Sequence, residues 1–254
     1  MKVLGDKLTW QDGSLTRLLD GKVSFGRDFF PDPRGAEIPE VVELPVHCYL
    51  LQRQGLAPVL IDTGSGDLYG DKGGGLKAAL ASNGVTPDDI DAVLMTHMHG
   101  DHCGGLLSLD FANATVFAAA DEIAYWPTQN HPSARFLANA TNLHPLKDGE
   151  RPLPGLRLWS LPGHTPGHAG YVIDGKIAVI GDVLHRADIQ LPDPLIATKF
   201  DVNRELATNT RLAALEQIAK DGLVTCGGHF QARVDGSPFL KLQPTNKGYK
   251  ALAL

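Results

Sequence analysis

The sequence predicts an α/β fold, built as one domain with a mixed sheet layer on each side of its middle. Three observations support this prediction. Apolar runs of strand length alternate with segments of helical propensity along most of the chain. The 254 residues include 43% hydrophobic and 20% charged residues, an ordinary globular mixture that supports a real core. Neither an internal repeat of fixed period nor a linker divides the chain.

The first half of the chain supplies three expected strands and one helix. Residues 1–40 are rich in Gly, Pro and Asp, and we expect them to cover another part of the molecule. Strands are expected at Val46–Leu51 and within Ala57–Gly64, the second as a continuous apolar run typical of a buried strand. A helix at Leu76–Ala81 leads to another buried strand at Ala92–Met95.

The second half continues this alternation around one irregular segment. A strand at Thr115–Ala119 precedes a helix at Asp121–Trp126, which Asp121 could cap. The polar segment Thr128–Leu146 has no clear period and is expected to form an insertion or a lid over a site. The remaining expected elements are strands at Leu156–Leu161, Ala169–Ile173 and Lys176–Ile180, a hairpin turn at Asp174-Gly175, a helix over Asn203–Asp221 and a strand at Leu223–Cys226.

Charge and cysteine content limit the partners and the compartment. Lys and Arg number 23 against 29 Asp and Glu, so the formal net charge is −6 and no nucleic acid partner is expected. No run of 18 apolar residues occurs and the N-terminus lacks an apolar signal region, so we expect a soluble, cytoplasmic protein without a membrane partner. The three cysteines, Cys48, Cys103 and Cys226, fit reduced thiols of a cytosol.

The ten histidines are the unusual count in this composition. Four candidate ligands fall within His97-Met98-His99-Gly100-Asp101-His102, directly after the expected strand at Ala92–Met95. Positions i and i+2 of extended chain face the same side, so His97 and His99 can point at one metal ion. Gly100 would then permit a turn that brings Asp101 and His102 to a second ion. Nitrogen and carboxylate donors suit zinc, and iron, manganese or cobalt use the same set.

Three further donors each follow an apolar run, where buried strands of α/β sheets commonly build sites: His164, Asp182 and His229. A lone histidine is more simply explained as a satisfied polar residue. The clustering of several donors, with Gly104-Gly105 directly after the first four, favours a metal site instead.

Together these segments resemble the metallo-β-lactamase-fold hydrolase superfamily, which carries H-x-H-x-D-H, then Gly-Gly, then separated His, Asp and His. The match runs from about Leu44 to His229 and includes Leu60–Gly64 and His164–His168. The resemblance implies a four-layer αββα sandwich. It also implies two metal sites that share a bridging carboxylate: His97, His99 and His164 at the first, Asp101, His102 and His229 at the second, and Asp182 between them.

Residues around the ligands receive roles from the same resemblance. Asp62 and Thr63 are expected to hydrogen-bond ligand histidines, and His168 to brace the loop that carries His164. For Asp62 the simpler alternative is a turn-forming residue before Gly64. Cys103 adjoins a ligand and is expected to be an ordinary small buried residue.

The implied chemistry is hydrolysis by a hydroxide shared between two divalent ions. Two ions about 3.5–4 Å apart can bind one water and lower its pKa to near neutrality. Asp182 would bridge the ions, and Asp101 would both ligate and accept the proton of the attacking water. Asp101 and Asp182 are therefore the predicted catalytic residues.

The substrate class rests on a softer similarity. Gly181–His185, Phe200-Asp201 and the helix Asn203–Asp221 are similar to the branch that contains methyl parathion hydrolases and quorum-quenching N-acyl-homoserine lactonases. A small ester or lactone is therefore expected first and a phosphotriester second. The candidate pocket walls, each of which could instead be ordinary core, are His185, Phe29, Phe30, Trp126, Phe136 and Phe230.

Other readings stay open. Zinc β-lactamases of the commonest subclass carry cysteine at the position of Asp182, which disfavours antibiotic hydrolysis. With iron, the same ligands would suit a sulfur-compound dioxygenase, and a thioesterase similar to glyoxalase II is a further alternative. A metal-binding module without turnover is the third. A small-molecule substrate is the expected partner, and a homodimer is left open.

Overall fold

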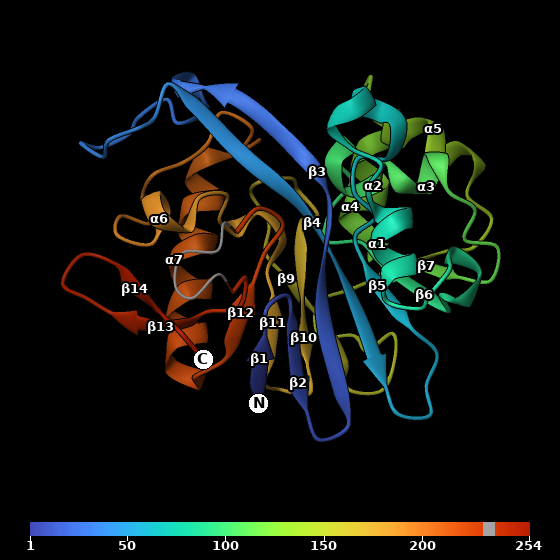
Figure 1. Ribbon diagram of the computed structural model, residues 1–254. Helices are drawn as coiled ribbons and strands as arrows, with labels where there is room; N and C mark the ends of the chain where they lie inside the picture. Colours follow the sequence, from blue (N-terminus) through green and yellow to red (C-terminus); the bar gives the residue numbers. More distant parts are fainter. Residues whose placement is uncertain (231–236) are drawn as a thin grey trace.

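Two β-sheets pack face to face at the centre of the molecule, and helices cover their outer faces, in a computed structural model that describes residues 1–230 and 237–254 (Figure 1). Within these residues the larger sheet has eight strands that follow one another in chain order. The first to fifth strands pair antiparallel, and the fifth to eighth strands pair parallel, so the fifth strand takes part in both kinds of pairing. The strands are β1 (Lys2–Leu4), β2 (Lys7–Trp10), β3 (Gly13–Gly26), β4 (Val41–Arg53), β5 (Val59–Ile61), β6 (Ala92–Leu94), β7 (Thr115–Ala119) and β8 (Leu143–Leu146).

The smaller sheet is also mixed. Its order is β12-β11-β10-β9, with β11 and β12 parallel and the other neighbours antiparallel. A C-terminal hairpin is joined to β12 by a bridge between Thr225 and Leu240. The strands are β9 (Leu156–Ser160), β10 (Ala169–Ile173), β11 (Ile177–Val179) and β12 (Val224–Cys226), and those of the hairpin are β13 (Lys241–Pro244) and β14 (Tyr249–Leu252).

Helices lie on both outer sides of the paired sheets (Figure 1). The larger sheet carries α1 (Leu76–Ser82), α2 (Gly100–Cys103), α3 (Gly105–Ser108), α4 (Ala120–Tyr125) and α5 (Pro132–Asn139). The smaller sheet carries α6 (Ala187–Gln190) and α7 (Arg204–Asp221). Short 3-10 turns complete the description: η1 (Arg27–Phe29), η2 (Gly66–Lys72), η3 (Pro87–Asp89), η4 (Trp126–Thr128) and η5 (Gly181–Val183).

The main core lies between the two sheets. Side chains from both sheets meet there, among them Leu15, Tyr49, Leu94, Leu158 and Tyr171. Strands β5 and β6 are buried at every residue, because helices cover the face that the second sheet does not. This double burial explains why their sequences are continuous apolar runs instead of alternating ones.

The expected αββα sandwich is confirmed, and several local predictions agree with the structure. The Asn203 side chain accepts a hydrogen bond from the Leu206 N–H at 3.0 Å and caps α7, which ends at Gly222 with φ +63°. Asp174 and Gly175 both have positive φ, as a two-residue hairpin turn between β10 and β11 requires.

No strand was predicted within residues 1–40, yet β1, β2 and β3 lie between Lys2 and Gly26. Strand β3 pairs with β4 from Gly13 opposite Arg53 to Gly26 opposite Val41. Long antiparallel strands of this kind keep one face partly in solvent, so their polar and glycine residues conceal the strand pattern.

Two further boundaries differ from the expectation. Helix α4 begins at Ala120, and its N-cap is Ala119, which supplies no side-chain hydrogen bond, so Asp121 does not cap it. The segment Thr128–Leu146 contains α5 and ends in β8, which pairs with β7 as the last strand of the larger sheet. No helix of the described chain is both long and apolar enough to cross a membrane.

Shortening Leu158 to alanine is expected to destabilise the fold. Leu158 is 1% exposed between the sheets, so Leu158→Ala should lower the free energy of unfolding by about 2–5 kcal/mol through lost burial and a residual cavity. Leu4, which is 73% exposed, provides the control, since Leu4→Ala should change stability by less than about 0.5 kcal/mol. Urea unfolding measures both, and equal losses for the two variants would contradict the packing described here.

Candidate metal centre

Four of the predicted ligands lie on one short stretch of chain at the carboxyl end of β6. His97 and His99 lie in the loop after the strand, and Asp101 and His102 lie on the single turn of α2. The His99 carbonyl accepts hydrogen bonds from the N–H groups of His102 and Cys103, both at 3.0 Å. These bonds fix the geometry between the extended loop and the helix, so the ligands on either side of Gly100 keep a defined separation.

The glycines of this stretch serve close packing. Gly100 does not adopt a positive φ, contrary to the conformational role expected for it, but a β-carbon there would lie 2.6 Å from the Tyr69 hydroxyl. A β-carbon at Gly104 would lie 1.9 Å from the Ser65 carbonyl oxygen, and one at Gly105 would lie 2.2 Å from the Thr63 carbonyl oxygen. The backbone of α2 and α3 therefore packs directly on the chain that follows β5.

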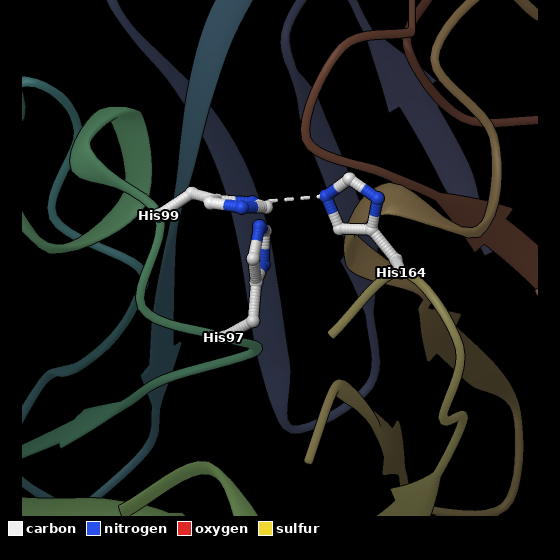
Figure 2. A group of neighbouring side chains, drawn as sticks. All are labelled: His97, His99 and His164. Carbon is white, nitrogen blue, oxygen red and sulfur yellow. Dashed lines mark hydrogen bonds between the residues drawn. The ribbon is translucent and has the colours of Figure 1, made fainter. Parts of the chain in front are cut away.

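The other three predicted ligands come from the smaller sheet. His164 follows β9, Asp182 lies in η5 after β11, and His229 follows β12. His97, His99 and His164 converge, with His99 Nδ1 3.0 Å from His164 Nε2 (Figure 2). Donor atoms within 4.8 Å of one another form four overlapping groups: His97, His99 and His164; His97, His102 and Asp182; Asp101, His102 and His229; and His164, Asp182 and His185.

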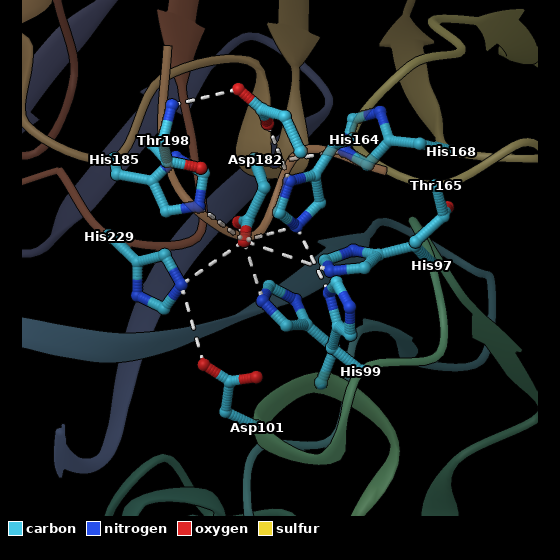
Figure 3. A network of polar contacts seen from close by, with 12 residues as sticks. His97, His99, Asp101, His164, Thr165, His168, Asp182, His185, Thr198 and His229 are labelled. Atoms are coloured by element: carbon cyan, nitrogen blue, oxygen red, sulfur yellow. Dashed lines mark hydrogen bonds and ion pairs between the residues drawn. The ribbon is translucent and has the colours of Figure 1, made fainter. Parts of the chain in front are cut away.

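Asp182 lies at the middle of these groups, as Figure 3 shows. Its Oδ2 is 3.7 Å from His97 Nε2, 3.4 Å from His164 Nε2 and 3.3 Å from His229 Nε2. Its Oδ1 is 3.3 Å from His102 Nε2. The carboxylate therefore faces histidines of both predicted metal sites at once.

The residues present fit a bound cation. His97 Nε2, His102 Nε2 and Asp182 Oδ1 are buried and make no hydrogen bond with proper geometry. Buried polar atoms are nearly always satisfied, so three neighbouring atoms without hydrogen bonds fit the coordination of a cation. Imidazole nitrogen and carboxylate oxygen are donors that suit zinc and other first-row divalent ions.

The hydrogen bonds of the ring Nδ1 atoms leave Nε2 free to ligate. His102 Nδ1 donates to Asp62 Oδ2 at 2.8 Å, and His164 Nδ1 donates to Asp201 Oδ1 at 2.9 Å. His229 Nδ1 donates to the Pro45 carbonyl at 2.7 Å. A partner on Nδ1 sets the tautomer and the orientation of the ring, which is the usual arrangement behind metal-bound histidines.

Residues predicted to support the ligands contact them in different ways. Asp62 contacts a ligand ring, and it also accepts hydrogen bonds from the Thr96 N–H and hydroxyl, both at 2.7 Å. Thr63 contacts only the main chain of His102, whose carbonyl accepts its N–H and its hydroxyl. His168 accepts the N–H of Asp182 on Nε2 at 2.9 Å and donates from Nδ1 to the Leu161 carbonyl, so it supports the Asp182 turn.

The pKa shifts differ among the predicted ligands. Burial lowers the pKa of His97 well below its usual range, so this ring is neutral near pH 7. Burial has the same effect on the pKa of His99. Burial opposes the charge of Asp182, but the nearby histidines, His229 first, hold its pKa well below the usual range. Burial also opposes protonation of His164, yet Asp182 and Asp201 raise its pKa to about 9.

Two buried carboxylates near the site were missed by the sequence analysis as site residues. Asp201 accepts from His164 and also accepts the Thr198 N–H at 2.9 Å, with Arg211 3.5 Å away. Glu122 accepts hydrogen bonds from Met98 and Thr165, which adjoin predicted ligand histidines in the sequence. Asp201 lies 37 positions from His164, so no local spacing could have joined them.

A cavity of about 640 Å³, a volume in the range of small-molecule sites, is lined by five of the predicted ligands: His99, Asp101, His164, Asp182 and His229. Of the predicted wall residues, Phe29, Trp126 and His185 line it. The other three do not: Phe30 and Phe230 are buried in separate apolar clusters, and Phe136 packs on the helices over the larger sheet. The remaining apolar and aromatic walls are Val23, Phe25, Leu44, Tyr69, Tyr125 and Phe200.

Comparisons with known proteins agree with this fold. The family model described as Metallo-beta-lactamase superfamily matches residues 41–229. Metallo-beta-lactamase domain-containing protein 1 of Homo sapiens is 33% identical over 187 residues, which are 69% of this chain and 59% of that protein. An N-acyl homoserine lactonase of Bacillus sp is 26% identical over 155 residues, 53% of this chain and 60% of the relative. The matches thus span about 60% of the length of these two relatives.

One solved structure is similar over nearly its whole length. It is AidC, described as a dizinc quorum-quenching lactonase in complex with a product, N-hexnoyl-L-homoserine. Its TM-score to this chain is 0.85 at 20% sequence identity, and the similarity covers 97% of this chain and 96% of that one. At this identity the similarity shows the shared fold.

Metal binding is expected to release protons. The pKa of His164 is raised to about 9, so without metal this ring is protonated near pH 7. The raised pKa stabilises the metal-free fold fully below about pH 6.5, and this stabilisation is lost as the pH rises through about 9. A divalent ion displaces the His164 proton, so zinc affinity should rise between about pH 6 and pH 8. Calorimetric titration with zinc in buffers of different ionisation enthalpy measures the release. His144→Ala, at an exposed histidine, should leave the proton count unchanged, whereas a pH-independent affinity in the wild type would contradict the prediction.

Proposed function

Because this chain belongs to the metallo-beta-lactamase superfamily, we propose that it is a metal-dependent hydrolase that cleaves small esters or lactones. The observation that carries the proposal is the convergence of donors from both sheets on the buried Asp182 carboxylate. A lactonase among the sequence relatives supports the lactone class.

The proposed centre holds two divalent ions, zinc first, with iron, manganese or cobalt compatible with the same donors. His97, His99 and His164 would hold one ion, Asp101, His102 and His229 the other, and Asp182 would bridge them. When bound, such ions polarise the bond under attack and make water a nucleophile near neutral pH.

Asp101 and Asp182 would have different tasks. The Asp182 side chain is 4% exposed and faces imidazoles, so it suits bridging and not proton transfer to solvent. The Asp101 side chain is 17% exposed, lines the cavity and places Oδ2 3.5 Å from His229 Nε2. It can therefore accept a proton from the attacking water and pass it to solvent.

His185 would contact the leaving group. Its ring stacks on His229 with centroids 5.4 Å apart, and Phe29 packs against it at 5.3 Å. Its Nε2 lies 3.2 Å from Asp182 Oδ2, and it lines the cavity. Beside Asp182, this ring would offer a hydrogen-bond donor to negative charge that develops during attack.

The cavity walls favour a neutral, apolar group beside the bond that is cleaved. Val23, Phe25, Phe29, Leu44 and Phe200 form an apolar side that can bury an acyl or aryl group. Neutral phosphotriesters share this apolar character, so phosphotriester hydrolysis is the second candidate.

Removing a ligand is expected to remove metal and activity together. His97→Ala and Asp182→Ala should each lower both metal content and ester or lactone hydrolysis. Loss of a residue that only supports a ligand costs about 10–100-fold, and loss of a ligand itself should cost more. Elemental analysis and initial rates on the same preparations measure this. His144→Ala, remote and exposed, is the control with unchanged metal content and rate. Full activity in a metal-free preparation would refute the assignment.

A substrate panel tests the class of bond. The metal-loaded protein is assayed on lactones, aryl esters, thioesters and phosphotriesters, and we expect the highest kcat/KM for an ester or lactone, rising with apolar chain length because of the apolar wall. Highest kcat/KM for phosphotriesters would favour the second candidate. Failure on every compound with two metals bound would indicate a binding module. Iron in the protein as isolated, with its absorption spectrum, would point to the sulfur-compound dioxygenase.

A further inference from the structure

Glu122 is a fully buried carboxylate that belongs to none of the ligand groups. It lies on α4, behind the cavity wall, and accepts four hydrogen bonds. Oε1 accepts the Met98 N–H at 2.8 Å and the Trp126 indole N–H at 2.5 Å. Oε2 accepts the Thr165 hydroxyl at 2.6 Å and the Gly167 N–H at 3.2 Å.

These donors belong to the two loops that carry the first predicted metal site. Met98 lies between His97 and His99, after β6 of the larger sheet, and Thr165 directly follows His164, after β9 of the smaller sheet. One carboxylate thus holds together two segments that come from different sheets and that supply the three imidazoles of Figure 2.

The contact is close as well as polar. A β-carbon at Gly167 would lie 2.0 Å from the backbone nitrogen of Glu122, so the His164 loop and α4 meet backbone to backbone. Any side chain at position 167 would push the loop away from the helix. This gives a physical reason for glycine between Thr165 and His168.

Neutral donors alone satisfy this carboxylate. Burial raises the pKa of Glu122, and its hydrogen bonds oppose that shift. No Lys or Arg of the described chain forms an ion pair with it. An unsatisfied buried polar group is costly, so loss of any one of the four donors should destabilise this part of the fold.

Glu122 also reaches the wall of the cavity. The Trp126 ring that it anchors lies 5.2 Å from the His99 ring and 4.5 Å from the His131 ring, measured between centroids. Both His131 and Trp126 line the cavity. The same side chain therefore contacts the metal-binding loops and the substrate wall.

We propose that Glu122 is a positioning residue that sets the spacing of His97 and His99 against His164 and couples these ligands to the Trp126 wall. The inference rests on the metal centre proposed above. Glu122 itself neither binds metal nor touches substrate; it acts through Met98, Thr165 and Trp126.

Glu122→Gln tests the proposal, with cobalt(II) added to the chelator-treated full chain as the probe. The amide keeps the size of the side chain but turns one acceptor into a donor that faces two existing donors. We expect affinity for one of two cobalt ions to fall about 10–100-fold, and the visible absorption of the bound cobalt to change. Unchanged affinity and spectrum would overturn the proposal.

Asp20→Asn is the matched control. Asp20 is also a buried carboxylate, 3% exposed, and it accepts the Ser65 and Leu76 N–H groups at 2.7 and 3.1 Å without a contact to a ligand side chain. The Asp20→Asn variant should have a lower melting temperature and the same cobalt titration as the wild type. An equal loss of cobalt affinity in this variant would show a general effect of stability and overturn the specific role.

Thr165→Val provides a second variant that keeps the shape of the loop and removes one donor to Oε2. It should weaken the same cobalt ion by a smaller factor, and combining it with Glu122→Gln should cost less than the product of the two factors, since both remove one interaction. Multiplicative factors would contradict the coupling. If the wild type binds no cobalt, the proposed metal centre itself is overturned. If the wild type and the variants bind cobalt equally well, only the role of Glu122 is overturned.

Discussion

The attraction between the buried Asp182 carboxylate and the imidazoles around it is the interaction on which the site depends. A carboxylate loses its hydration on burial, and only nearby positive charge or strong hydrogen bonds compensate for that cost. In this protein nearby histidines, His229 first and then His102, hold the pKa of Asp182 low, and these two follow strands of different sheets. The strand ends of both sheets therefore meet at this carboxylate.

Buried carboxylates outside the ligand groups maintain this arrangement. Asp62 joins the end of β5 to His102, and Asp201 joins the chain before α7 to His164. Asp62 adopts φ +58°, a left-handed conformation that costs a non-glycine residue some strain and that its three hydrogen bonds offset. Each of these carboxylates thus holds one predicted ligand within its own half of the sandwich, where apolar side chains alone would leave the imidazole free to shift.

The layered fold and the convergence of the donor side chains could be predicted from the sequence because both leave local traces. Buried parallel strands produce apolar runs, and donors directly after such runs meet at one edge of the sheets. The supporting carboxylates leave no such trace: Glu122 reads as an ordinary helical acid, and its partner Thr165 is 43 positions away. The pocket shows the same limit, since Phe29 lines the cavity and the adjacent Phe30 packs away from it. Strands β1 to β3 were not predicted because polar residues interrupt their apolar pattern, and in β3 some of these, such as Ser14 and Thr16, are buried.

The long β3–β4 pair supplies part of the cavity wall from a different stretch of chain than the predicted ligands. Its far end carries Val23, Phe25 and Leu44 into the cavity, whereas the ligands lie on loops after other strands. Changes of side chain near Gly26 and Val41 can alter which molecules fit, provided that the Pro45 carbonyl of β4 keeps its hydrogen bond from His229. A descendant of this chain can therefore acquire a new selectivity by gene variation in one hairpin while it inherits the reaction centre unaltered.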